Sequence, residues 1–166
     1  MRCVFALCCF LTITLVSISG CGGGRPSLVP AVGTVTLNGE PLEGARVGLM
    51  PVGIEGYERP STATTDAQGN FTIGTYGKND GVPQGTYTVT VVKKELASKL
   101  PKDFNSEDLT DAGPVKYKWI TPMLYGDPES SGLTVEITSD GMSPDQIALT
   151  GEPEMEIVGG KSANEP

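Results

Sequence analysis

The stretch Gly85-Thr86-Tyr87-Thr88-Val89-Thr90-Val91-Val92 decides the fold of this chain. Its side chains alternate, with Tyr87, Val89 and Val91 on one side and three threonines on the other. Such alternation predicts a half-buried β-strand, because successive side chains of a strand point to opposite faces. β-branched and aromatic residues also favour strands. We therefore expect a strand here, with its apolar side in a core and its threonines toward solvent.

The same two-residue period recurs along the chain. It is found at residues 33–37, 45–50, 71–73, 133–137 and 147–149. Antiparallel sheets with one solvated face have this pattern, and two such sheets packed face to face would bury all of the apolar columns at once. The sequence therefore predicts an all-β antiparallel β-sandwich of about seven strands, formed by residues 31–150.

Turn residues separate these runs. Asn38-Gly39 predicts a tight hairpin turn, since both residues tolerate positive φ. In 66–70, Gly69 is expected in a left-handed conformation, with Asp66 accepting hydrogen bonds within its own turn. Alternate polar side chains in 66–70 superficially match a calcium loop, but a second acidic ligand and the distal glutamate are missing. We favour a turn and expect no metal.

One segment departs from the pattern. Residues 94–118 are charged, contain Pro101 and Pro114, and have a weak helical pattern at 95–100. We expect an irregular insertion, in which one helical turn is an option. A solvated spacer is the favoured interpretation, although long loops often carry function. Residues 151–166 form a polar C-terminal tail, whose end we expect to be frayed.

The N-terminus has the features of a bacterial lipoprotein signal. Arg2 precedes an apolar run, and the run ends in Ile18-Ser19-Gly20-Cys21. In such signals the cysteine receives diacylglycerol and the chain is cut before it, here between Gly20 and Cys21. The apolar run is shorter than the ~20 residues that span a bilayer. An ordinary secretory signal or an uncleaved anchor is the alternative.

Cleavage would divide the chain into a signal at 1–20 and a lipid-anchored flexible tether at 21–30. The other cysteines, Cys3, Cys8 and Cys9, would be lost, so the mature chain could form no internal disulfide. Two or three acyl chains such as palmitate would hold Cys21 in a bilayer almost irreversibly. Gly22 in place of aspartate favours the outer membrane of the bacterial envelope, with the domain outside the cytoplasm.

Composition excludes several functions. The chain has 12 basic and 20 acidic residues and a net charge of −8. Without a basic stripe, nucleic acid is not an expected partner. Histidine is absent, which removes the commonest general base and metal ligand. Serine motifs of hydrolases are also missing. We expect no catalytic activity and no cofactor.

Three aromatic residues are candidates for ligand binding. Tyr117, Trp119 and Tyr125 lie among lysines and a proline, where they could form a flat platform for a sugar ring or a partner's side chain. The simpler interpretation, which we favour, is that Trp119 covers one edge of the sandwich core, as large aromatic residues commonly do.

Four motifs occur in a fixed order along the chain. They are Gly33-x-Val35, Gly39-x-Pro41-x-x-Gly44-Ala45-x-Val47, Thr65-Asp66-x-x-Gly69-x-Phe71 and Gly85-x-Tyr87-x-Val89-x-Val91. Together they resemble the carboxypeptidase regulatory-like domain, a transthyretin-like (prealbumin-like) β-sandwich. The run at 125–135 is also similar to small planctomycete surface lipoproteins with this domain. The resemblance implies an accessory fold without catalytic residues of its own.

These observations lead to three hypotheses of function. The first is a lipid-anchored interaction or structural module of the cell envelope, with an envelope protein as partner. The second is a carbohydrate-binding module that uses the aromatic residues around Tyr117 and Tyr125, with a glycan as partner. The third and weakest is an undetected hydrolase. An apolar exposed sheet edge would favour the first hypothesis, and exposed coplanar aromatic rings would favour the second.

Overall fold

The computed structural model describes residues 25–97 and 115–158, and these residues form almost only β-strands. A single-turn 3₁₀ helix, η1 (Met123–Gly126), interrupts them. The strands are β1 (Leu28–Val29), β2 (Val32–Leu37), β3 (Glu40–Pro41), β4 (Arg46–Val52), β5 (Ser61–Thr64), β6 (Asn70–Thr72), β7 (Val82–Pro83), β8 (Gly85–Val92), β9 (Lys94–Leu96), β10 (Val115–Trp119), β11 (Thr134–Thr138), β12 (Gly141–Ser143), β13 (Gln146–Leu149) and β14 (Glu154–Val158).

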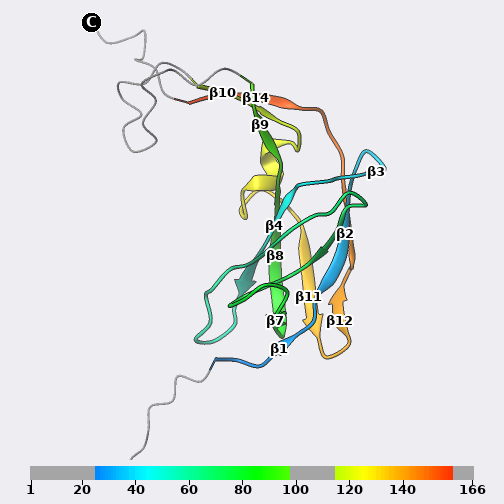
Figure 1. The fold of residues 1–166 in the computed structure, drawn as a ribbon. Coiled ribbons are helices and arrows are strands. Elements are labelled where there is room, and N and C mark those ends of the chain that lie inside the picture. The colour runs from blue at the N-terminus through cyan, green and yellow to red at the C-terminus, as the bar shows by residue number, and fades with distance from the viewer. Residues whose placement is uncertain (1–24, 98–114, 159–166) are drawn as a thin grey trace, which may run out of the picture.

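Two main sheets form a sandwich, which confirms the predicted fold class (Figure 1). One sheet has the order β12-β11-β8-β4-β5, and the other has the order β13-β2-β3 with β6 also paired to β2. Strand β8 lies in the middle of the larger sheet, where Tyr87, Val89 and Val91 are fully buried. Val35 and Leu149 of the smaller sheet belong to the same core.

Tyr87 carries the one polar group of the β8 core column. Its hydroxyl donates a 2.8 Å hydrogen bond to the carbonyl oxygen of Pro83. Burial raises the pKa of the Tyr87 phenol well above its ordinary value, so the group stays neutral and keeps its donor proton. The buried Tyr87 hydroxyl therefore has the hydrogen-bond partner that a buried polar group needs.

The structure corrects three details of the predicted sandwich. Strand β13 pairs with β2 in parallel rather than antiparallel fashion, because the chain crosses between the sheets after β12 instead of turning back in a hairpin. Thr90 is buried rather than solvent-facing, because η1 contacts β8 and the Thr90 hydroxyl lies over Gly48. The described residues hold 14 strands rather than about seven, since several strands have only two or three residues.

The predicted turns are present. Asn38 and Gly39 both have positive φ, 53° and 89°, as a tight β2–β3 hairpin turn requires. Gly69 has φ of 78°, and a Cβ there would lie 2.4 Å from the Val35 carbonyl oxygen. The Asp66 carboxylate accepts hydrogen bonds from the Gln68 and Asn70 amides. Glycine is thus required at position 69 for both conformation and space.

The ends of the predicted insertion form strands. β9 and β10 pair with each other, and β14 pairs with the other side of β10. The helical turn expected at 95–100 is wrong for the residues of β9, whose backbone bonds go to β10; residues 98–114 lie outside the described part of the chain. Residues 154–158 of the expected polar tail form β14. We call β14-β10-β9 the distal sheet.

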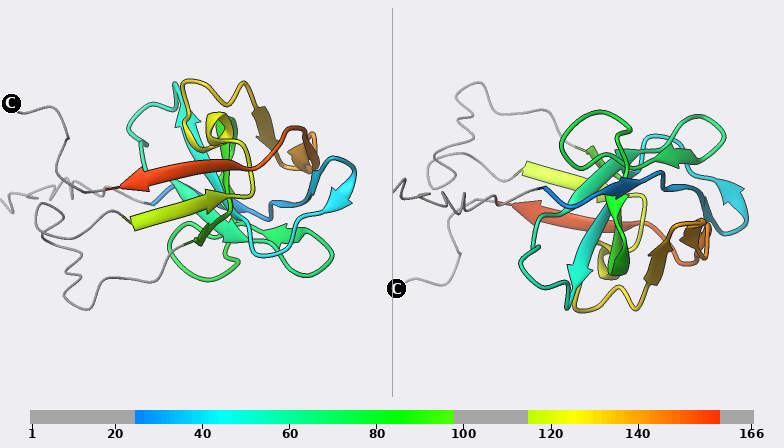
Figure 2. Two further views of the ribbon diagram at one scale, coloured as in Figure 1. Left: turned by 90° about the horizontal axis from the view of Figure 1, so that it is seen from above. Right: turned by 90° about the horizontal axis from the view of Figure 1, so that it is seen from below.

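The distal sheet lies at one end of the domain, and β1 lies at the other (Figure 1). The two views along the long axis agree, with β10 and β14 nearest the viewer from above and the β1 segment nearest from below (Figure 2). β1 pairs with β7, which follows the loop at 74–81. We call β1, β7 and this loop the β1 end. None of the helices among the described residues could span a bilayer, and Gly20 and Cys21 fall outside those residues.

Candidate interaction surface

The register of the distal sheet sorts its side chains onto two faces. In β10, Tyr117 is opposite Glu156 of β14, and Trp119 is opposite Lys94 of β9. Directly opposed residues of antiparallel strands share a face. Tyr117, Trp119, Lys94 and Glu156 therefore lie on one face, which we call the aromatic face.

The four side chains of the aromatic face contact one another. The Lys94 ammonium lies 4.7 Å from the Tyr117 ring centroid and 5.0 Å from the Trp119 ring centroid. One Glu156 carboxylate oxygen accepts hydrogen bonds from Trp119 Nε1 at 2.8 Å and from Lys94 Nζ at 3.2 Å. The Trp119 bond, with Lys94, holds the pKa of Glu156 below its ordinary value. The polar groups of Trp119, Lys94 and Glu156 thus have hydrogen-bond partners within the aromatic face.

Trp119 also joins the distal sheet to the sandwich. Its indole ring is half-buried, and a Cβ at Gly126 in η1 would lie 3.0 Å from it. Gly126 thus lets the ring pack directly on the η1 backbone. This contact lies beside Val92 of β8, which a Cβ at Gly126 would approach within 3.3 Å.

Of the three predicted platform residues, the structure brings Tyr117 and Trp119 together on β10. Tyr125 of η1 is not on β10: it packs against the sandwich core, and its hydroxyl donates to the Thr150 carbonyl and accepts from the Thr150 amide. Sequence reasoning missed Lys94 and Glu156 as neighbours of Trp119. Their positions depend on the pairing of β9 and β14 with β10, which no local motif indicates.

The opposite face of the distal sheet is the more exposed. It carries Met155 and Ile157 of β14, whose side chains are 55% and 63% exposed. Their partners across β10 are Lys118 and Lys116. Within the described ranges, no further strand pairs with the outer edge of β9 or of β14. The distal sheet therefore presents an apolar pair on an edge strand, bordered by lysines.

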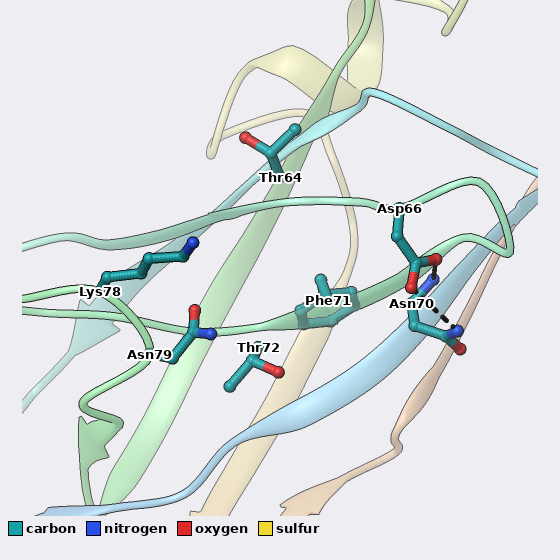
Figure 3. Close-up of a pocket in the computed structure, with 7 residues that line it drawn as sticks. All are labelled: Thr64, Asp66, Asn70, Phe71, Thr72, Lys78 and Asn79. Carbon is teal, nitrogen blue, oxygen red and sulfur yellow. Dashed lines mark hydrogen bonds between the residues drawn. The ribbon is translucent and has the colours of Figure 1, made fainter.

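A polar hollow of about 500 Å³ lies on the sandwich. Figure 3 shows Lys78 and Asn79 on one side of the hollow and Asp66 and Asn70 on the other. Phe71 at its floor is buried. The Asp66 carboxylate is occupied by its own turn, chiefly by the Asn70 amide, which lowers its pKa. The hollow thus offers polar groups without an exposed aromatic ring.

The acidic residues that the structure describes do not assemble into a metal centre. Within residues 25–97 and 115–158, no group of three acidic, histidine or cysteine side chains is placed to hold an ion. Comparisons with protein-family models, with curated proteins and with solved structures gave no match. The surfaces of this chain are therefore the features that indicate its function.

Proposed function

We propose that the protein is a non-catalytic, membrane-anchored lipoprotein whose β-sandwich presents the distal sheet to a protein partner of the bacterial envelope. The observation that carries this proposal is the exposed pair Met155 and Ile157 on edge strand β14. Exposed apolar side chains that lie together mark interaction sites more often than isolated ones do. An edge strand also offers backbone groups with which a partner strand can pair.

The arrangement of the two ends supports an anchored module. The chain enters the domain at β1, and the distal sheet lies at the opposite end (Figure 1). A bilayer holding Cys21 would thus be on the β1 side, leaving the distal sheet toward a partner. The lipoprotein signal, the outer-membrane location and membership of the transthyretin-like carboxypeptidase regulatory-like family belong to this same proposal and rest on the sequence motifs.

The carbohydrate-binding alternative has less support. A sugar platform needs an open aromatic ring, and the Trp119 ring is half-buried against Gly126 and Lys94. Its indole N–H, the polar group that a sugar hydroxyl would use, already donates to Glu156. The polar hollow at Lys78 offers no stacking surface, since Phe71 is buried.

A photo-crosslinking amino acid tests the interaction surface. It is placed at Ile157 of the full-length protein in intact cells, and at the exposed Glu136 of the sandwich as a matched control. We expect one reproducible envelope protein to be captured from position 157 and not from position 136. Equal capture from both positions, or capture of polysaccharide alone from 157, would contradict the proposal.

The anchor has an independent test in the variant Cys21→Ser. We expect this variant to lose acyl labelling and to be released from membranes. A variant that remained uncut and membrane-bound would show that the N-terminal segment is an uncleaved anchor.

A further inference from the structure

Two guanidinium groups lie over one tyrosine at the β1 end. The Arg25 guanidinium carbon is 4.6 Å from the Tyr76 ring centroid, and that of Arg59 is 5.1 Å from it. Arg59 Nε also donates a 3.1 Å hydrogen bond to the Thr75 carbonyl oxygen. Among the described residues neither guanidinium forms a salt bridge. Arg59 is therefore held by a hydrogen bond and Arg25 by its contact with the Tyr76 ring, while both charges remain available.

The loop beneath them is rigidly built. The Asp80 carboxylate accepts hydrogen bonds from the backbone amides of Thr75, Tyr76 and Gly77. The Thr75 hydroxyl donates to the Gly81 carbonyl, and the Tyr76 ring packs against the core. Asp80 is thus used to fix the loop. Tyr76 is consequently a fixed support on which both arginines rest.

Chain length places this cluster close to a bilayer. Arg25 follows Cys21 by four residues, which reach at most about 14 Å in any conformation. An acyl group on Cys21 would bring Arg25, and with it Tyr76 and Arg59, to the lipid headgroups. Arginine suits this position because its planar donors match phosphate oxygens, and tyrosine is enriched at membrane interfaces.

Resting on the proposed anchor, we propose that Arg25, Tyr76 and Arg59 form a membrane-contact site that seats the β1 end on phospholipid headgroups. With this contact the domain does not rotate freely on its tether. The domain stands on the bilayer with the distal sheet pointing away from it. The excess of acidic residues in 21–166, 20 against the 11 basic ones left once Arg2 is removed with the signal, strengthens this orientation at an anionic surface, since the rest of the acidic domain is repelled.

Fluorescence energy transfer from Trp119, the only tryptophan, to a labelled lipid reports the orientation of the domain on a bilayer. Residues 21–166, with Cys21 as their only thiol, are coupled to maleimide lipid in vesicles of phosphatidylcholine and phosphatidylglycerol that contain a dansyl-labelled lipid. We expect low transfer for the unsubstituted chain and higher transfer for Arg25→Gln/Arg59→Gln. Removing each guanidinium should lower the docked-to-undocked ratio about fivefold.

Arg46→Gln is the matched charge control. Arg46 is the first residue of β4 and pairs with Val92, whereas the loop that leads to Arg59 follows the other end of β4. Arg25→Gln alone serves if the double variant unfolds, since Arg25 lies before the first strand. Equal transfer in the unsubstituted and substituted chains, or an equal rise in Arg46→Gln, would overturn the contact site. Chemical coupling replaces acylation, so this result is independent of the Cys21→Ser test in cells.

Discussion

Strands β8 and β10 have similar alternating sequences but different surroundings. In β8, the smaller sheet covers Tyr87, Val89 and Val91, and all three are fully buried. In β10, Val115 is buried but outside the core cluster, and Tyr117 and Trp119 are only half-buried beside Lys94. Alternation thus gives a strand two chemically different faces. Whether the apolar face becomes core or surface depends on what lies over it.

The largest expected effect is in β8. Tyr87→Ala removes a fully buried ring and its bond to Pro83, and should lower the free energy of unfolding by about 3–5 kcal/mol. Denaturant unfolding measures this loss. Tyr87→Phe is the control, since it keeps the ring and should cost only about 1 kcal/mol for the hydrogen bond. A loss below about 1 kcal/mol for Tyr87→Ala would contradict a core role for β8.

Trp119→Ala tests β10 in the same way and should cost about 2 kcal/mol, because only half of the indole is buried. The same unfolding measurement applies. Unchanged stability with loss of a bound partner would instead identify Trp119 as a ligand platform. Tyr87→Ala and Trp119→Ala together measure how much an aromatic side chain's contribution to the free energy of unfolding depends on a second sheet that covers it.

A smaller effect on stability is expected from the charge of Glu156 on the aromatic face. The hydrogen bond from Trp119, with Lys94, lowers the pKa of Glu156 below its unfolded value, so its ionised form stabilises the fold above the unfolded pKa. This contribution is lost as the pH falls through the lowered folded pKa. We expect the stability difference between the wild type and Glu156→Gln to shrink below about pH 4. A difference independent of pH from 3 to 7 would contradict the ion pair.

The smallest effect on stability is expected at the opposite face of the distal sheet. Ile157→Lys should change the free energy of unfolding by less than about 0.5 kcal/mol, because the side chain is 63% exposed. Capture of the partner in cells should nevertheless fall strongly. If stability fell as much as in Trp119→Ala, Ile157 would be part of a packed core rather than of an interaction surface.

Most of the sandwich could be predicted because its strands carry their own evidence. The runs ending in Leu37, Leu49 and Ile137 alternate, and Asn38-Gly39 and 66–70 have the residues that their turns require. The strands of the distal sheet were missed because their sequences carry little evidence of their own. β9 has only three residues, and β14 lies in a polar tail. The alternation in β10 and in β14 extends over only five residues, among charged ones, and their pairing is long-range, so neither sequence indicates its partner strand.

By itself the sequence determined which residues share a face, where the main hairpin turns lie and that Cys21 is the one cysteine beyond the N-terminal apolar segment. These are local properties, set by backbone sterics and by residue spacing. Only the tertiary structure decided that β13 runs parallel to β2, that Glu156 meets Trp119 and that Arg25 and Arg59 share Tyr76. Each of these contacts joins segments that only long-range pairing or packing brings together, and alternation along a single strand holds no information about its distant partners.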